Sequence, residues 1–280
     1  MAEITAAAVK ALRERTDLPM MECKKALVEA DGDAEKAVEI LKAQFKKIQD
    51  KRADNATEEG RVFFLASDDG SEAAMVEIQC ESAPVATGES LEDFGTALIS
   101  QLLNGPGADS PDALMDQTPD GGTNLRTLYE ELVNKIREKI VVNRIVRVNG
   151  PVGGYVHHDG KTGVIFQAKG EAGGDILRDV AMHIAALRPS VTHPEEVDAA
   201  VVQAERDRLS EEARATGKPD NIIDKIVDGR MKNFFVEQGV LLAQPFAKDD
   251  SKSVEKALSE CKLEAVGFYR WQVGGGNAES

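Results

Sequence analysis

From Glu77 to Ala86 the chain reads EIQCESAPVA, and this stretch decides how the first half of the fold is arranged. From Met75 to Cys80 the residue type alternates with a period of two, which predicts a half-buried β-strand. Pro84 has no amide donor and disfavours helical geometry in the residue before it, so no helix is expected to begin ahead of it. The residues from Ser82 to Val85 should therefore form an exposed loop at a strand end, followed by a helix from Ser90 onward.

The charge and the apolar runs limit the classes of partner. The 280 residues carry a formal net charge of -15, which disfavours nucleic acid as a partner. Solubility alone would also account for this charge. Apolar runs such as Val240 to Ala243 are too short to cross a membrane, and the chain start lacks the pattern of a signal peptide. Three scattered cysteines fit a reducing compartment. We therefore expect a cytoplasmic protein.

The first segment predicts a small helical bundle. Apolar residues recur at helical spacing from Glu3 to Arg15 and again from Met20 to Ala30, and Asp33 is placed to cap a third helix. Adjacent methionines, Met20 and Met21, are either core filler or an adaptable contact surface, and two neighbours cannot both point inward. We assign residues 1–55 to an N-terminal helical domain with its linker.

The remaining chain repeats one plan. A predicted hairpin over residues 61–78 is followed by helices near 91–102 and 125–136 and a strand at 140–148, with 108–123 expected as surface loop. A second hairpin over 155–169 is again followed by a helix, at 177–187. We predict an α+β fold in which two related α+β subdomains, residues 56–150 and 151–280, form the core.

The second subdomain carries a predicted insertion. A helix expected to begin at Pro194 and a return helix through Ile226 give an antiparallel helical hairpin over about 194–236. Beyond it the sequence predicts a strand at 240–242, a helix at 253–261 and a strand at 268–271.

Two motifs imitate functional sites. Residues 154–162 nearly spell a phosphate-binding loop, but one residue too many separates the glycines, and Lys161-Thr162 leads into a strand rather than a helix. His157 and His158 are adjacent on a strand and so face opposite sides, which argues against a metal site. With no nucleophile-base spacing elsewhere, we expect no enzyme activity, no cofactor, no metal and no nucleotide bound by this chain.

Several dispersed motifs resemble one known family. They are Thr16 to Leu27 (TDLPMMECKKAL), Ala181 to Ala186 (AMHIAA), Gly229 to Lys232 (GRMK) and Val266 to Phe268 (VGF). They resemble translation elongation factor Ts, whose first module is similar to ubiquitin-associated (UBA) three-helix domains. Asp17 is a departure, since glycine is commoner there.

This resemblance implies a partner and the residues that meet it. The family exchanges guanine nucleotides on elongation factor Tu, so the chain is expected to bind elongation factor Tu and promote GDP release during translation elongation. Arg13, Met20 and Met21 match positions that touch a helix of the GTPase domain. Ile136 and His157 match positions near the tip of the third domain of the partner, although core packing for Ile136 and an exposed strand edge for His157 would be the ordinary interpretations.

The opening loop departs most from the family. There it commonly reads Thr-Asp-Phe-Val-Ala and disturbs the magnesium and phosphate site of the GTPase, whereas this chain has Ser82, Ala83, Pro84 and Val85. The acid-aromatic pair is thus replaced by Ala83-Pro84. This replacement suggests one alternative to an exchange factor, a chaperone or scaffold of elongation factor Tu with weak exchange activity. A separate and weaker alternative is a small adaptor that binds other partners through the amino-terminal bundle.

Overall fold

The computed structural model describes residues 4–16, 18–171, 174–215, 217, 219–275 and 278–279. Glu3, at the start of the first predicted helix, and Asp17, in the family motif, lie outside this part of the chain. The backbone is a mixture of helices and strands, which confirms the α+β class. None of the helices in the described residues combines the length and the apolar character needed to cross a membrane.

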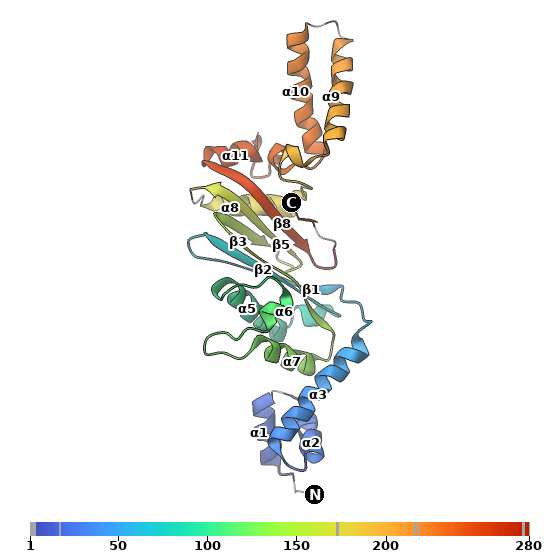
Figure 1. Cartoon of the computed structure of the whole chain (residues 1–280), viewed down its shortest axis with the longest axis vertical. Helices are drawn as coiled ribbons and strands as arrows, with labels where there is room; N and C mark the ends of the chain where they lie inside the picture. Colours follow the sequence, from blue (N-terminus) through green and yellow to red (C-terminus); the bar gives the residue numbers. More distant parts are fainter. Residues whose placement is uncertain are drawn as a thin grey trace. The chain divides into compact units, whose positions relative to one another are not determined.

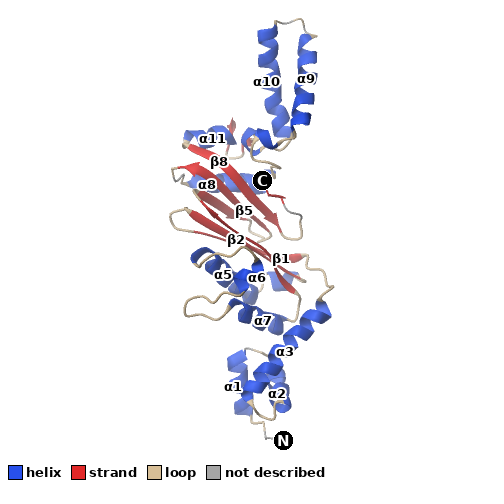
Figure 2. Ribbon diagram, viewed as in Figure 1, coloured by secondary structure: helices blue, strands red, loops and turns tan. Residues whose placement is uncertain are grey.

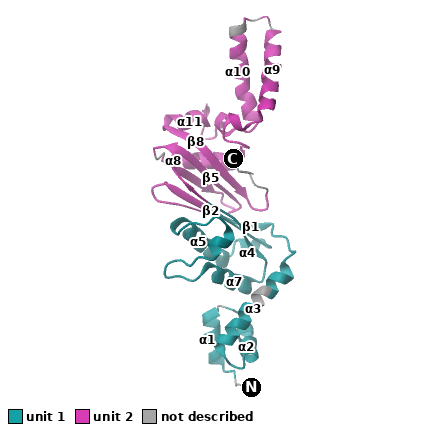
Figure 3. Cartoon of the chain, viewed as in Figure 1, with its two compact units in different colours: residues 1–63, 75–146 teal, residues 64–74, 147–280 magenta. Residues whose placement is uncertain are grey.

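The chain divides into two compact units (Figure 3). Unit 1 comprises residues 1–63 and 75–146, and unit 2 comprises residues 64–74 and 147–280. Unit 1 therefore contains the amino-terminal helices and the helices of the first repeat, and unit 2 contains the second repeat with its insertion. Figure 1 and Figure 2 show the helices and strands of each unit.

Three helices open unit 1 around a small apolar core. They are α1 (Ala6–Thr16), α2 (Met20–Glu29) and α3 (Ala34–Arg52). The Asp33 carboxylate accepts hydrogen bonds from the amides of Glu35 and Lys36 at 3.0 and 3.2 Å, so it caps α3 as predicted. Cys23, Ala26 and Leu27 of α2 are at most 1% exposed and form the centre of this core.

The rest of the first repeat follows the predicted order. Its elements are β1 (Glu59–Ala66), β2 (Glu72–Cys80), α4 (Ala83–Ala86), α5 (Glu89–Asn104), α6 (Pro111–Met115), α7 (Leu125–Ile136) and β3 (Ile140–Asn149). The strand order is β1-β2-β3. In α5, Gly95 allows close packing, because a Cβ there would lie 2.1 Å from the ring of Phe63.

Strand β2 is almost completely buried, so the prediction of a half-buried strand was wrong. Glu77 is fully buried, yet it resembled a solvent-facing residue in the alternating pattern. Its carboxylate receives hydrogen bonds from Arg144 Nε at 2.6 Å, Asn143 Nδ2 at 3.1 Å and Gln79 Nε2 at 2.7 Å. Because the charge is paired and its lone pairs are satisfied, both faces of the strand can be covered.

The segment at 108–123 also differs from the prediction of surface loop. Ser110 accepts a hydrogen bond at 3.2 Å from the Ala113 amide and caps α6, and Leu114 and Met115 of this helix are buried. Pro111 stands in the first turn, where no amide donor is needed. The polar composition of the segment therefore hid a short helix with an apolar inner side.

Unit 2 builds a second sheet with a helix packed on it. The elements are β4 (Val152–Val156), β5 (Thr162–Gly170), α8 (Asp175–Leu187), β8 (Leu263–Gln272) and β9 (Ala278–Glu279), and the strand order is β4-β5-β8-β9. Phe166, Val180, Ile184 and Phe268 belong to one apolar core. Gly153 lets α8 approach β4, because a Cβ there would lie 2.4 Å from the backbone of Leu177.

The insertion is a pair of helices lying side by side (Figure 1). They are α9 (Ala199–Arg214) and α10 (Asp220–Glu237), preceded by a 3-10 turn, η1 (Pro194–Glu196). The prediction that the helix begins at Pro194 was wrong. Val197 is extended, and the Asp198 carboxylate accepts from the Ala200 amide at 2.7 Å, so the helix begins at Ala199.

The predicted strand at 240–242 was wrong as well. Leu241–Ala243 form a 3-10 turn, η2, whose Leu241 amide donates to Val191 at 2.9 Å, so an apolar run too short for a strand fills the core. A small hairpin follows, β6 (Pro245–Phe246) and β7 (Asp249–Ser253), which the sequence analysis missed. Helix α11 (Val254–Glu260) and strand β8 lie where the sequence predicted them.

Candidate functional site

The residues after β2 form a single helical turn rather than an irregular loop. Ser82 is extended, and from Ala83 to Ala86 the chain is helical, with the Ala86 amide donating to the Ser82 carbonyl at 3.1 Å. The prediction that no helix could begin ahead of Pro84 was wrong. Pro84 lies in the first turn, where amides have no intrahelical acceptor, so its missing N–H costs nothing there.

Hydrogen bonds anchor this turn from below. The Ser82 hydroxyl donates to the Glu138 carboxylate at 2.8 Å. The neighbouring Glu81 carboxylate accepts from Arg52 and Asn55, each at 2.7 Å, and from the Lys139 amide at 2.5 Å. Because these partners come from α3, the linker after it and the two residues before β3, three separate segments hold the base of the turn.

Titration of the two residues before Ser82 follows from these contacts. Burial raises the pKa of Glu81, but the hydrogen bonds from Lys139, Asn55 and Arg52 lower it by more, so the net shift is downward. Burial raises the pKa of the Cys80 thiol to about 11. The thiol therefore stays protonated and donates to the Ser82 carbonyl, with 3.4 Å between the sulfur and the oxygen.

The outer side of the turn is short and neutral. Ala83 and Pro84 are exposed, Val85 is partly buried and Ala86 is buried. The turn thus projects an alanine and a proline, with neither a charged group nor an aromatic ring. The hydrogen bonds of the anchor residues hold its base.

The start of α2 is held beside the end of α7. Met20 and Met21 are 53% and 64% exposed, so neither fills the core and the contact-surface interpretation is the one the structure favours. Glu22, the next residue, forms an ion pair with Arg137. Ile136 precedes Arg137 and is partly buried, and Glu138, one residue further on, is the anchor of Ser82.

These contacts join three of the predicted site elements within unit 1. We call Met20, Met21, Ile136 and the Ser82–Val85 turn the unit 1 face. Arg13 is exposed on α1, and in the described residues no hydrogen bond or ion pair links it to the turn. The Glu22–Arg137 pair is the contact that the sequence could not reveal, because 115 residues separate its partners.

His157 belongs to unit 2 and lies just after β4. Its Nδ1 atom is 3.0 Å from the Tyr155 hydroxyl, and its ring centroid is 4.2 Å from that of the exposed His158. The prediction that the two histidines lie on a strand and face opposite sides was wrong, because β4 ends at Val156 and the chain turns there. Within the described residues no group of three metal-ligating side chains is present, here or elsewhere. Lys161-Thr162 leads into β5, so the phosphate-loop interpretation fails as predicted.

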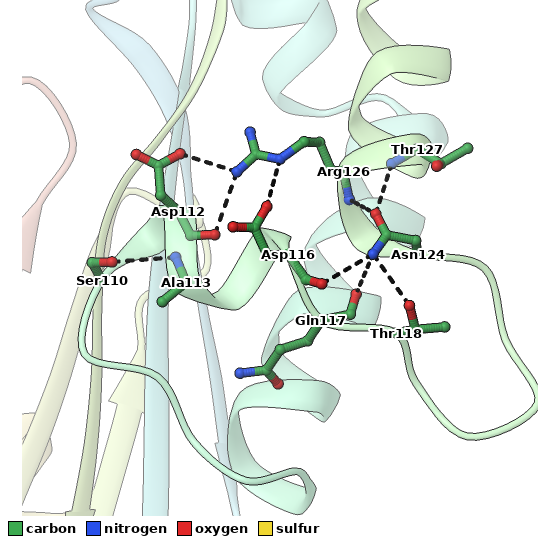
Figure 4. Close-up of polar contacts among 9 residues, drawn as sticks. All are labelled: Ser110, Asp112, Ala113, Asp116, Gln117, Thr118, Asn124, Arg126 and Thr127. Atoms are coloured by element: carbon green, nitrogen blue, oxygen red, sulfur yellow. Dashed lines mark hydrogen bonds and ion pairs between the residues drawn. The ribbon is translucent and has the colours of Figure 1, made fainter.

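A polar cluster between α6 and α7 is structural (Figure 4). Arg126 donates to the carboxylates of Asp116 and Asp112 at 2.8 and 3.3 Å. The Asn124 side chain caps α7 and donates to Thr118 and to the carbonyls of Asp116 and Gln117, each at 3.1 Å. These groups satisfy one another, so the cluster fastens the 116–124 segment to α7.

Comparisons with known proteins identify one family. The family model described as Elongation factor TS matches residues 84–275. A protein named Elongation factor Ts from Renibacterium salmoninarum is 42% identical over 283 residues, covering 98% of this chain and 100% of its own. The protein of that name from Hydrogenovibrio crunogenus is 39% identical, covering 98% and 92%. The one from Streptomyces coelicolor is 38% identical, covering 98% and 100%.

Proposed function

The chain belongs to the elongation factor Ts family, and we propose that it acts on elongation factor Tu through the unit 1 face together with Arg13 and His157. Family membership makes it a guanine nucleotide exchange factor of translation elongation. The observation that carries the proposed site is the anchoring of the Ser82–Val85 turn, because a fixed, exposed turn can press on a partner without first being ordered.

Exchange requires a difference in affinity between two states of the partner. A factor that binds the nucleotide-free GTPase more tightly than the loaded one weakens nucleotide binding by the same factor. Exposed methionines and an anchored turn on one unit supply separate contacts for this purpose. The scaffold with weak exchange, which rested on Ala83-Pro84, is not favoured by the family assignment.

The domain organisation is a further part of the proposal. We assign residues 1–55 to a UBA-like helical domain, 56–150 to one core subdomain and 151–280 to a second, with the insertion at about 194–236. Two observations support this: α1, α2 and α3 have an apolar core of their own, and the third strand of each sheet pairs with the second strand of its hairpin. The shared strand order supports the internal repeat.

We also infer that the chain acts by binding alone, in the cytoplasm, without nucleic acid, membrane or bound nucleotide. The net charge of -15 supports the first exclusion, since it repels a phosphate backbone. The buried Cys23 and Cys80 are free thiols, which supports a reducing compartment.

Stopped-flow release of a fluorescent GDP analogue from the cognate elongation factor Tu tests the function. We expect the full chain to accelerate release until the rate saturates with factor concentration. Binding of the full chain without acceleration at saturation would contradict exchange and restore the scaffold alternative. Excess unlabelled GDP without the factor gives the uncatalysed rate.

A further inference from the structure

A cavity of about 420 Å³ in unit 2 contains two arginines and opens beside His157. Its walls come from α8, from the β4–β5 hairpin and from β8. Arg188 and Arg270 line it together with His157, Tyr155, Asp159 and Met182. Neither the rejected metal and phosphate-loop interpretations nor the Ser82–Val85 turn gives this cavity a role.

Among the described residues, Arg270 is buried without a carboxylate partner. It is 8% exposed, and within the described part of the chain its side chain makes one hydrogen bond, from a terminal nitrogen to Gln272 Oε1 at 3.3 Å. Its Nε atom is buried and has no hydrogen-bond acceptor among the described residues. Because a buried guanidinium charge without a counter-ion is costly, the arrangement suits an anionic group in the cavity that Arg270 lines.

Arg188 adds a second positive charge at the same cavity. It ends α8 in the left-handed conformation, with φ 51°, and its side chain is exposed. Burial and the proximity of Arg188 both lower the pKa of Arg270. Neither arginine has an ion pair with an acidic group in the described part of the chain, although 49 Asp and Glu residues outnumber 34 Lys and Arg overall.

The surroundings favour a protein side chain over a free anion. Asp159 also lines the cavity, and its carboxylate, which accepts from the Lys161 amide at 2.8 Å, would repel a doubly charged phosphate more strongly than a singly charged carboxylate. Met182 and Leu187 of α8 are 43% and 49% exposed. Exposed apolar side chains around a desolvated arginine are typical of the centre of a protein interface.

We propose that Arg188 and Arg270 bind the carboxylate of an acidic side chain of elongation factor Tu, with Met182 packing against the residues around it. This inference rests on the proposed function, because it names a contact of the same complex. It extends the partner surface of unit 2 from His157 to the cavity beside it.

Charge reversal at Arg188 tests the proposal. Arg188→Glu should weaken binding to the cognate elongation factor Tu by about tenfold, and Arg188→Gln by less. The dependence of the dissociation constant on salt should become shallower in both variants, because one ionic contact is lost. Arg178→Glu is the matched control, since Arg178 is exposed on the same helix but does not line the cavity, and it should change binding by less than about twofold.

A second variant uses the cavity itself. Met182→Glu introduces a carboxylate at the cavity wall, where it can occupy the arginines in place of the partner, so binding should weaken while the variant stays folded. Arg188→Glu and Met182→Glu binding as tightly as Arg178→Glu would overturn the proposal. Failure of the unmodified chain to bind elongation factor Tu would instead contradict the proposed function.

Discussion

Ser82 and Glu138 are 56 residues apart in the sequence and are joined by a hydrogen bond of 2.8 Å. The other carboxylate oxygen of Glu138 is buried and has no hydrogen-bond partner in the part of the chain that the structure describes. Ser82 is therefore the group that satisfies Glu138 as well as the first residue of the exposed turn. Stability of the core and position of the turn are linked through this one contact.

Ser82→Ala should destabilise the protein and slow exchange. Loss of the hydroxyl leaves a buried carboxylate without its donor, at a cost of about 1 to 2 kcal/mol in the free energy of unfolding. Urea unfolding and GDP release measure the two effects. Glu138→Gln keeps an oxygen acceptor for Ser82, so its effect on exchange should be smaller. Equal exchange rates for Ser82→Ala and the parent would mean that the anchor does not position the turn.

Restoring the acid-aromatic pair should speed exchange. Ala83→Asp combined with Pro84→Phe places a carboxylate in the first turn of α4, where a negative charge is favourable, and an aromatic ring at an exposed position. A gain of about 2 kcal/mol at such a position corresponds to roughly a 30-fold faster GDP release. Pro84→Ala, as control, should alter the rate by less than about twofold, because the existing residues contribute little.

The methionine pair should matter for binding and little for folding. Met20→Ala with Met21→Ala removes two exposed side chains and should weaken binding to elongation factor Tu by about tenfold, while the unfolding temperature changes little. Val28→Ala is the matched control, because Val28 is a 52% exposed apolar residue of the same helix. Calorimetric titration measures the affinities. A large fall in unfolding temperature for the methionine variant would contradict the prediction, because it would show that the two methionines stabilise the fold.

His183 should make stability depend on pH. Burial lowers the pKa of His183 from 6.5, against the opposing effect of its hydrogen bond of 2.8 Å to Gln244. Below pH 6.5 the unfolded chain binds a proton that the folded chain does not. The free energy of unfolding therefore decreases as the pH is lowered, by at most about 1.4 kcal/mol per pH unit. Well above that pH the contribution of the neutral form is complete.

His183→Gln isolates this contribution. The variant should be less stable near neutral pH, but the gap to the parent should shrink on acidification, because glutamine does not titrate. His158→Gln, which replaces an exposed histidine, is the control variant. A constant gap between the parent and His183→Gln across the range would contradict a buried neutral histidine.

Local patterns in the sequence predicted the elements well where one helix or hairpin decides its own form. Asp33 caps α3, and the hairpins at 61–78 and 155–169 follow from alternation and turn residues. Patterns failed where a distant partner decides. Glu77 resembled a surface residue because its partner Arg144 is 67 residues away. The helical turn at Ala83 escaped prediction because the rule for proline in helix interiors was applied to a first turn.

The candidate site divides in the same way. Exposure of Met20 and Met21 followed from their adjacency, and the family resemblance supplied the partner. The contacts that assemble the unit 1 face, Glu22 with Arg137 and Ser82 with Glu138, join residues that no periodicity relates. The arginine cavity gave no signal at all, since Arg188 and Arg270 meet only after β8 has paired with β5.

The helical hairpin of α9 and α10 can change in length during evolution without disturbing the rest of unit 2. Leu209, Ile223, Val227 and Met231 form an apolar core that draws on these two helices alone. Where the hairpin leaves and rejoins unit 2, the Ser190 amide donates to the Gly239 carbonyl at 2.8 Å, and Val191 pairs with Val240. Because these contacts hold the two junctions together, insertions or deletions of whole helical turns beyond them would leave the sheet and α8 intact. The length of the helical hairpin can therefore differ between related proteins.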